Sequence, residues 1–222
     1  MPVITIRGTL GSSAPEIGKL VAEKLHIDYV DREIIAEIAE RLRRPDYDVA
    51  AKEMPPGSLG GRIVEALSYD YPSQSLPDVA YTGAYLPTWE MPLDNIQYLA
   101  SLEFVVKKLA SGSSIVIRGR GSQFILKDYP GALHILIVAP IALRVKRVME
   151  SSKVKETEAR KEIERSDSSH HEFARRYFHA SLEDPNNYDL VINTEHFSIE
   201  DAAGIVADAL RYKDKTFIPN KQ

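Results

Sequence analysis

Residues 3–17 read VITIRGTLGSSAPEI and change from a strand-like to a helix-like pattern within one short segment. Val3 to Ile6 form a β-branched run that stops at Gly8. From Glu16 onward the apolar residues recur at helical spacing, at Ile17, Leu20, Val21 and Leu25. The segment predicts a strand, a glycine loop and a helix, which is the building unit of α/β proteins.

The same alternation continues along the chain. Short apolar runs predict further strands at 26–31, 114–117, 134–139 and 188–193. Helical spacing predicts helices at 33–44, 61–69, 93–110, 156–179 and 199–210, the last capped by Ser198. Pro140 opens a further, basic helix, whose buried face is expected to be Ile141, Val145, Val148 and Met149. Continuous apolar strands between amphipathic helices imply an α/β fold with a mainly parallel sheet covered on both faces.

The length of 222 residues fits one domain. We expect residues 1–44, 93–150 and 186–211 to form its core. Residues 45–92 are rich in proline and tyrosine and are interpreted as an irregular or helical insertion over the acceptor-binding region. The strongly charged segment 151–185 is interpreted as a helical lid.

Composition excludes several classes of function. The 28 basic and 32 acidic residues give a formal charge of -4, so the chain has no global attraction to nucleic acid or to an anionic membrane. Without cysteine it has neither disulfides nor thiolate metal sites. No apolar run approaches the roughly 18 residues of a bilayer span. We therefore expect a cytoplasmic protein that binds neither nucleic acid nor membrane.

The glycine loop is a candidate phosphate site, because ligands of open α/β sheets bind beyond the carboxyl ends of the strands. A complete phosphate loop reads G-x-x-x-x-G-K-[ST]. With Gly8 as the first glycine, Ser13, Ala14 and Pro15 stand at the second glycine, the lysine and the hydroxyl residue. On these residues alone, a small-residue turn without a ligand, with Pro15 near the start of a helix, is the favoured interpretation.

Several segments in order resemble the cytidylate kinase-like family of the P-loop nucleoside monophosphate kinase superfamily. They are the opening 3–13, then 16–25 and 29–35, and further on the strand with its Gly-Arg segment at 115–126, the strand and basic helix at 134–147 and the final strand at 187–193. The resemblance does not extend over residues 45–92.

This resemblance implies a three-layer P-loop kinase-like fold, ATP with Mg²⁺ as the phosphoryl donor, and a nucleoside monophosphate or other small phosphate-bearing acceptor. The ATP-binding residues are then Gly8, Thr9, Leu10, Gly11, Ser12, Ser13 and Ala14. Two departures accompany the incomplete loop. Cytidylate kinases have Gly-Arg-Asp where this chain has Gly119-Arg120-Gly121, and their lid pattern Asp-Ser-x-Arg is Asp167-Ser168-Ser169-His170 here.

Arginines supply the candidate phosphate ligands, since a guanidinium fork suits phosphate oxygens. The candidate catalytic residues are Arg120, Arg165 and Asp167, and the candidate acceptor-binding residues are Asp31, Arg118, Arg120, Arg175 and Arg176. The alternatives are a surface role for the arginines, a solvated helical face for the lid, and an N-cap role for Asp31. Arg7 flanks the loop, and Arg144 and Arg147 carry the family's pattern or pack on acidic neighbours.

Three interpretations of function remain open at this stage. The first is a nucleotide kinase with an incomplete loop, and the second is an inactive P-loop protein that binds nucleotide or a phosphorylated metabolite. The third is a different enzyme of the same fold that uses the insertion as a pocket. The aromatic residues of the insertion equally fit base stacking, packing on the core or the face of a homodimer.

Overall fold

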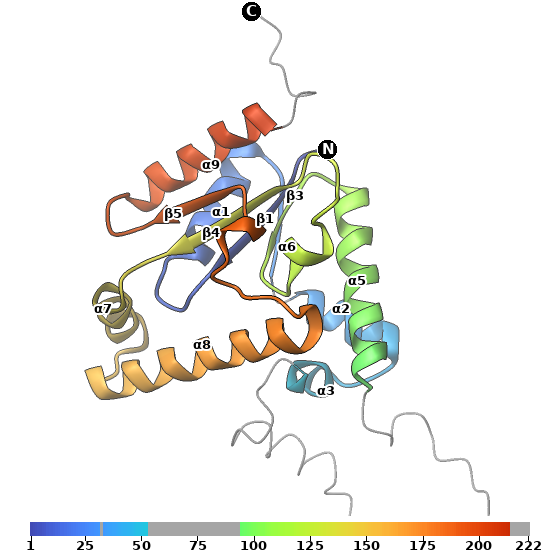
Figure 1. Ribbon diagram of the computed structural model, residues 1–222, viewed down its shortest axis with the longest axis horizontal. Helices are drawn as coiled ribbons and strands as arrows, with labels where there is room; N and C mark the ends of the chain where they lie inside the picture. The colour runs from blue at the N-terminus through green and yellow to red at the C-terminus, as the bar shows by residue number, and fades with distance from the viewer. Residues whose placement is uncertain (32, 53–93, 214–222) are drawn as a thin grey trace, which may run out of the picture.

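The computed structural model describes residues 1–31, 33–52 and 94–213. Its centre is a parallel sheet with the strand order β2-β3-β1-β4-β5 (Figure 1). The strands are β1 (Val3–Gly8), β2 (Asp28–Val30), β3 (Ile115–Arg118), β4 (Leu133–Val138) and β5 (Leu190–Asn193). All four strand pairings are parallel, with Val3 opposite Ile115 and Ile4 opposite Leu133. The central position of β1 brings the glycine loop to the middle of the carboxyl edge.

Helices cover both faces of the sheet (Figure 1). They are α1 (Ala14–Leu25), α2 (Glu33–Leu42), α3 (Asp46–Ala51), α5 (Asn95–Gly112), α6 (Ser122–Ile125), α7 (Ile141–Ser152), α8 (Glu156–Phe178) and α9 (Ile199–Lys213), and a short 3-10 turn spans Pro185–Asn187. One core joins α1 and α9 to Ile4 and Ile6 of β1. A second core joins α2 and α5 to Val3, on the opposite face. The predicted α/β class with a parallel, two-sided sheet is confirmed.

The face alternation of β1 decides where its polar residues lie. Ile4 and Ile6 point to the α1 and α9 side, so Thr5 and Arg7 share the other face with Val3. Thr5 hydrogen-bonds the ring of His134 on β4 at 2.8 Å, with both residues buried. Arg7, nearer the carboxyl end, therefore emerges on the face opposite α1.

The predicted elements agree with the structure within a few residues, with one clear error on α7. Ser198 caps α9 as expected, since its hydroxyl accepts the N–H of Asp201 at 3.0 Å. On α7, Val145 and Val148 are buried but Ile141 is 50% exposed. The buried residue on that face is Arg144 instead, because its side chain finds polar partners in the glycine loop and α8. The helix expected at 61–69 lies outside the described residues.

Helix α8 crosses the carboxyl edge from the α7 side to the end of β3 (Figure 1). At the end of β3, Gly119, Arg120 and Gly121 all have positive φ angles, of 72°, 59° and 67°. A β-carbon at Gly121 would lie 2.2 Å from the ring of Phe178, the last residue of α8. Glycine is thus required at 121 by the left-handed backbone conformation and by the close contact with Phe178 of α8. Among the described helices, none combines the length and apolar character needed to cross a membrane.

We expect Gly121→Ala to lower the free energy of unfolding by at least about 2 kcal/mol, since the left-handed backbone alone costs an L-residue about 1–2 kcal/mol. The added methyl group would also collide with Phe178. Urea denaturation measures the change. Gly204→Ala in α9 is the matched control, because a β-carbon there meets no atom within 4 Å, and it should be neutral or stabilising by about 0.5–1 kcal/mol. Equal effects of the two substitutions would contradict this account of the turn.

Candidate active site

The glycine loop between β1 and α1 has its carbonyl groups bound from outside. Arg144 donates its Nε–H to the carbonyl of Leu10 at 2.7 Å, and Arg147 donates to the carbonyl of Gly11 at 3.2 Å. The hydroxyl of Thr194, just after β5, donates to the carbonyl of Ser12 at 3.1 Å. Helix α7 and the end of β5 therefore hold the outer side of the loop.

The N–H groups of the same loop are left available. Among the described residues, no hydrogen bond uses the N–H of Leu10, Gly11, Ser13 or Ala14. Gly11 and Ser13 have left-handed backbones, with φ of 81° and 64°. Such turns form concave backbone sites for anions, and the N-terminus of α1 adds its partial positive charge. The loop presents N–H donors because its carbonyl groups are already satisfied elsewhere.

Close packing explains the two glycines of the loop. A β-carbon at Gly11 would lie 2.7 Å from the carbonyl oxygen of Arg144, so only glycine lets α7 approach this closely. A β-carbon at Gly8 would lie 2.3 Å from that of Ala14, across the loop. Ala14, which replaces the lysine of a complete loop, is itself fully buried. The side chain of Ala14 therefore does not reach the cleft.

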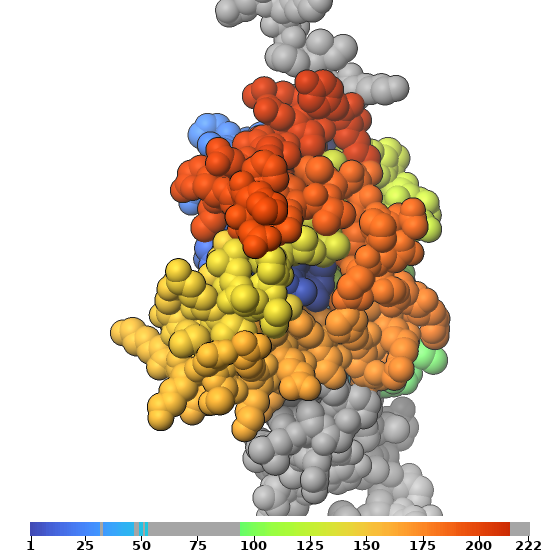
Figure 2. All heavy atoms as spheres, turned by 60° about the vertical axis from the view of Figure 1, so that its left-hand side comes forward, coloured from blue at the N-terminus to red at the C-terminus, as the bar shows by residue number. Residues whose placement is uncertain are grey.

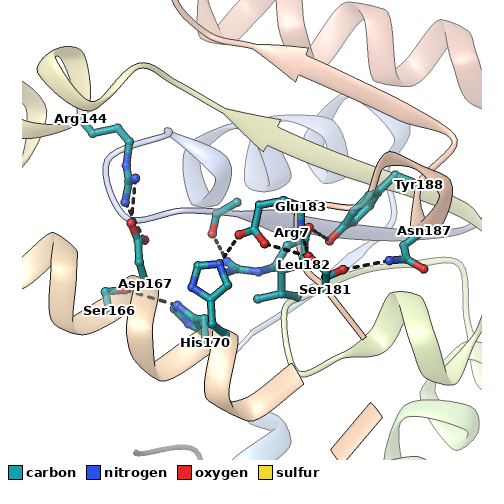
Figure 3. Close-up of polar contacts among 12 residues, drawn as sticks. Arg7, Arg144, Ser166, Asp167, His170, Ser181, Leu182, Glu183, Asn187 and Tyr188 are labelled. Carbon is teal, nitrogen blue, oxygen red and sulfur yellow. Dashed lines mark hydrogen bonds and ion pairs between the residues drawn. The ribbon is translucent and has the colours of Figure 1, made fainter. Parts of the chain in front are cut away.

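Arg144 also joins the loop to α8. Its guanidinium binds the carboxylate of Asp167 through two hydrogen bonds of 2.9 and 2.7 Å (Figure 3). Arg144 is 7% exposed, so this bidentate pair compensates a buried charge. Asp167, expected as a catalytic residue, therefore lies beside the loop with its carboxylate engaged by Arg144.

Arg7 lies within the cleft between the loop and α8 (Figure 3). It is 9% exposed, and its guanidinium donates to the carbonyl of Gly8. No carboxylate among the described residues forms an ion pair with it. Burial lowers the pKa of Arg7 and the charge of nearby Arg118 acts in the same direction, whereas Tyr188, Asp167 and Glu183 oppose the shift. Among the described residues, the cleft thus contains a buried cation that no carboxylate contacts in an ion pair.

The predicted acceptor residues at the ends of β2 and β3 lie together. Arg118 donates to the carboxylate of Asp31 at 2.5 Å, and both side chains are partly buried. Arg120 follows on the left-handed turn and is half-buried. Asp31 is thus the ion-pair partner of a phosphate-ligand candidate, and its own N–H is bound by the carboxylate of Glu33 at 2.9 Å.

The positive charge of this cleft acts on the pKa of His170 on α8. Desolvation, together with the charges of Arg7, Arg118 and Arg120, lowers the pKa of His170 to about 3. The residue lies on the solvent side of α8. Its ring lies 3.4 Å from the hydroxyl of Ser166 (Figure 3). Three arginines therefore act on one point of α8.

The remaining lid candidates are less closely connected with the cleft. Arg165 is exposed on α8. Arg175 is exposed and paired with Glu172 at 2.6 Å, as expected for a solvated helical face. Arg176 is half-buried, lies 3.7 Å from Glu172 and stacks over the ring of Tyr177. Their functional roles stay predictions.

Sequence reasoning missed the residues that hold the loop. Arg144 and Arg147 were noticed for their spacing of three on a basic helix, but nothing in the sequence indicated that they bind the loop carbonyls. Thr194 carried no signal at all, since its partner Ser12 is 182 positions away in the chain. For Arg7, the signal was the period-two alternation of β1, which places a charged side chain on a covered face.

A separate hollow lies away from this site. It has a volume of about 790 Å³ and lies between α5 and the segment after α6, lined mainly by apolar and lysine side chains. None of the arginines of the cleft contributes to it. The cleft at the carboxyl edge is the better candidate, because the loop N–H groups and the buried cation meet there. Figure 2 shows N-terminal atoms, in blue, at the bottom of a hollow framed by the yellow and orange segments.

Binding of a polyanion in this cleft should raise the pKa of His170 from about 3 by roughly one unit or more, since the anion offsets the charge of the three arginines. An NMR titration of the histidine rings with and without tripolyphosphate measures the change. His134 is the internal control: burial lowers its pKa too, but Asp189 and Lys213 are the charges near it, so the ligand should leave it unchanged. Equal responses of both rings would contradict this location for the anion.

The chain is similar to several known proteins. Cytidylate kinase from Methanosarcina barkeri is 25% identical over 214 residues, covering 93% of this chain and 97% of that protein. Uronate isomerase from Corynebacterium glutamicum is 32% identical over 98 residues, or 44% of this chain, and the chain spans 19% of that protein's length. A solved structure of an uncharacterized protein from Eubacterium ventriosum matches with a TM-score of 0.65 and 18% identity, covering 95% of this chain and 98% of that chain. The last similarity concerns the fold alone.

The model of the cytidylate kinase-like family matches residues 3–196. The match includes the glycine loop, the Gly-Arg turn and α8, and it also spans residues 45–92, which the sequence resemblance did not cover. The expected family and the P-loop kinase-like fold are both confirmed, and the chain belongs to the cytidylate kinase-like family.

Proposed function

We propose that this protein transfers a phosphoryl group from ATP to a nucleoside monophosphate, cytidylate-like, or to another small phosphate-bearing acceptor. One observation carries the proposal: the glycine loop has its carbonyl groups bound by α7 and Thr194 while four of its N–H groups are available. A polyphosphate satisfies such donors, and family membership makes ATP the expected source. Arg7, Arg118 and Arg120 supply the positive charge, and Arg120 lies on the left-handed turn after β3.

ATP and Mg²⁺ fit the residues present. The N–H groups of Leu10, Gly11, Ser13 and Ala14 would hold the donor phosphates. Within the described part of the chain, no cluster of three or more acidic or histidine side chains could ligate a metal ion. Mg²⁺ would therefore be held chiefly by phosphate oxygens and water, as is common for this ion. When bound, it neutralises charge that develops on the phosphates.

The described carboxylates of the cleft are bound in ion pairs, which favours a phosphate acceptor over an alcohol. An alcohol must lose a proton to a general base, whereas a phosphate monoester already carries a nucleophilic anionic oxygen near neutral pH. Asp31 and Asp167 are bound by Arg118 and Arg144, and Glu183 is bound by His171. None of these three is a free base. The acceptor oxygen forms its bond to the γ-phosphorus, the bond to the β,γ-bridging oxygen breaks, and ADP keeps that electron pair.

The arginines at the end of β3 would hold the acceptor. Arg118 and Arg120 are adjacent to the loop edge, and their charges reach His170 on α8. Phosphoryl transfer depends mainly on positioning and charge stabilisation, so arginines can perform much of the work of a loop lysine. In this proposal, Arg165, Arg175 and Arg176 approach the phosphates only when α8 closes on the bound ligands.

A protein that binds nucleotide without turnover is the second candidate. Ala14 and Pro15 stand where a complete loop has lysine and a hydroxyl, and this specific loss favours a sensor or partner module. Both candidates need the same loop geometry. Product formation separates them.

We expect ADP to form from ATP with Mg²⁺ when nucleoside monophosphates are added, and not when sugars or polyols are added, because the cleft lacks a free base among its described carboxylates. Arg120→Ala should raise the KM for the acceptor about tenfold or more, since a charged hydrogen bond contributes about 1.5–3 kcal/mol. Coupled ADP detection at high protein concentration measures both. ATP binding by calorimetry without any acceptor-dependent ADP would favour the inactive binder.

Arg147→Met should weaken ATP binding about 5- to 20-fold, because the carbonyl of Gly11 loses its donor and the loop is no longer held in its binding conformation. Isothermal titration calorimetry measures the ATP dissociation constant. Arg211→Met is the matched control, as Arg211 is exposed on α9 and pairs with Asp208 at 3.0 Å. If ATP bound equally well to both variants, the loop would not depend on α7.

A further inference from the structure

We infer that Arg7, a residue of β1, binds the terminal phosphates of the donor in place of the lysine that the loop lacks. This inference rests on the proposed function and assigns a ligand of that site. Its chemical class is an inorganic or nucleotide-linked polyphosphate, recognised through non-bridging oxygens. The guanidinium reaches the cleft from the strand before the loop, on the face opposite α1, whereas a loop lysine comes from the helix after it.

The first support is the uncompensated charge of Arg7. It is 9% exposed, and its only hydrogen bond among the described residues goes to the carbonyl of the next residue, Gly8. Buried charges in proteins are normally paired or hydrogen-bonded throughout, because desolvation of an ion is costly. One backbone carbonyl leaves most of the five guanidinium N–H donors available. An anionic ligand would supply the missing acceptors and counter-charge.

The second support is that the neighbouring acids already have partners. Asp167 is held by two hydrogen bonds from Arg144, and Glu183 binds His171 and Ser181 (Figure 3). Asp31 binds Arg118. The described acids around the cleft are thus engaged elsewhere while Arg7 remains buried. Arg118 and Arg144 thus have carboxylate partners, whereas Arg7 has none in ion-pair contact among the described residues.

The third support is unused polar capacity around Arg7. Tyr188 stands beside it and donates its hydroxyl to the carbonyl of Leu182 at 2.9 Å (Figure 3). Gln123 donates to Tyr188 at 3.3 Å, is 2% exposed, and has a side-chain oxygen without a partner. The hydroxyl of Ser12 also has no partner among the described residues, but it lies against Gly8 on the α1 side of β1, opposite Arg7. Buried polar atoms are rarely left unsatisfied, so the unpartnered oxygen of Gln123 indicates a place for a polar ligand or ordered water beside Tyr188.

Charge also accumulates at this point rather than on the surface generally. Arg7, Arg118 and Arg120 all act on His170, although the chain as a whole is acidic, with a formal charge of -4. Of these, Arg118 has an internal carboxylate and Arg7 does not. Arg7 is next to the first glycine of the loop, so its guanidinium and the loop N–H groups can bind the same phosphate chain.

The test compares Arg7→Met, Arg7→Lys and the control Arg211→Met, each with tripolyphosphate, which carries neither a base nor an acceptor group. Calorimetry should show tripolyphosphate binding by the unaltered protein and Arg211→Met, weakened about 10- to 100-fold in Arg7→Met. Arg7→Lys should fall between them. Without ligand, Arg7→Met should melt at the same or a higher temperature, because an uncompensated buried charge is removed.

The outcomes distinguish this inference from the proposed function. Unchanged tripolyphosphate affinity in Arg7→Met, no binding by the unaltered protein, or a lower melting temperature for both Arg7 variants without ligand would overturn the role of Arg7. Arg7-dependent tripolyphosphate binding without ADP formation from any acceptor would support the anion site and contradict the kinase. Acceptor-dependent ADP formation by an Arg7→Met variant that binds tripolyphosphate normally would leave the kinase standing and remove Arg7 from it.

Discussion

The hydrogen bonds from Arg144 and Arg147 to the carbonyl groups of the glycine loop are the interactions on which the site depends. A loop with free carbonyl groups would repel phosphate as much as its N–H groups attract it. By binding Leu10 and Gly11 from outside, the two arginines remove that conflict. Arg144 is in turn held by Asp167, so one buried guanidinium joins the loop, α7 and α8. Arg144 thus both holds α8 in place and binds a carbonyl group of the loop.

The arginines near this edge divide into two kinds by their partners. Arg144 and Arg118 each have a carboxylate partner, and the pair of Arg144 is the more buried of the two. Arg7 has a backbone carbonyl and lies in a buried position. Counting arginines in a cleft therefore says little about anion binding until each internal counter-ion is known. The same argument applies to the acids: Asp31 and Asp167 lie at the site, but each carboxylate is already bound by an arginine.

Much of the fold was predictable because it depends on local periodicity. Alternation along β1 and helical spacing after Glu16 are local signals, and the order of strands and helices followed from them. The partners of Arg144 were not predictable, because Leu10 lies 134 positions away and periodicity treats an arginine as a surface residue. The same limitation led to the wrong expectation that Ile141 would be buried. Tertiary hydrogen bonding outweighed the apolar pattern on that helix.

Within the site, the sequence indicated the loop, the Gly-Arg turn and several candidate arginines, and the roles of these residues stay predictions. Arg7 was among them only as a residue that flanks the loop, because the sequence does not show which arginine is buried. Arg7 on β1 would approach the phosphates from the strand before the loop, whereas a lysine of a complete loop follows it. Backbone pairing with β3 and β4 fixes the origin of the Arg7 side chain, and its planar guanidinium loses less conformational entropy per hydrogen bond than a lysine ammonium does. The accompanying cost is that the charge must stay buried when no ligand is present. That cost is tolerable only where the surrounding fold is held together by other interactions, and here the bidentate Arg144–Asp167 pair and the two glycine contacts provide them.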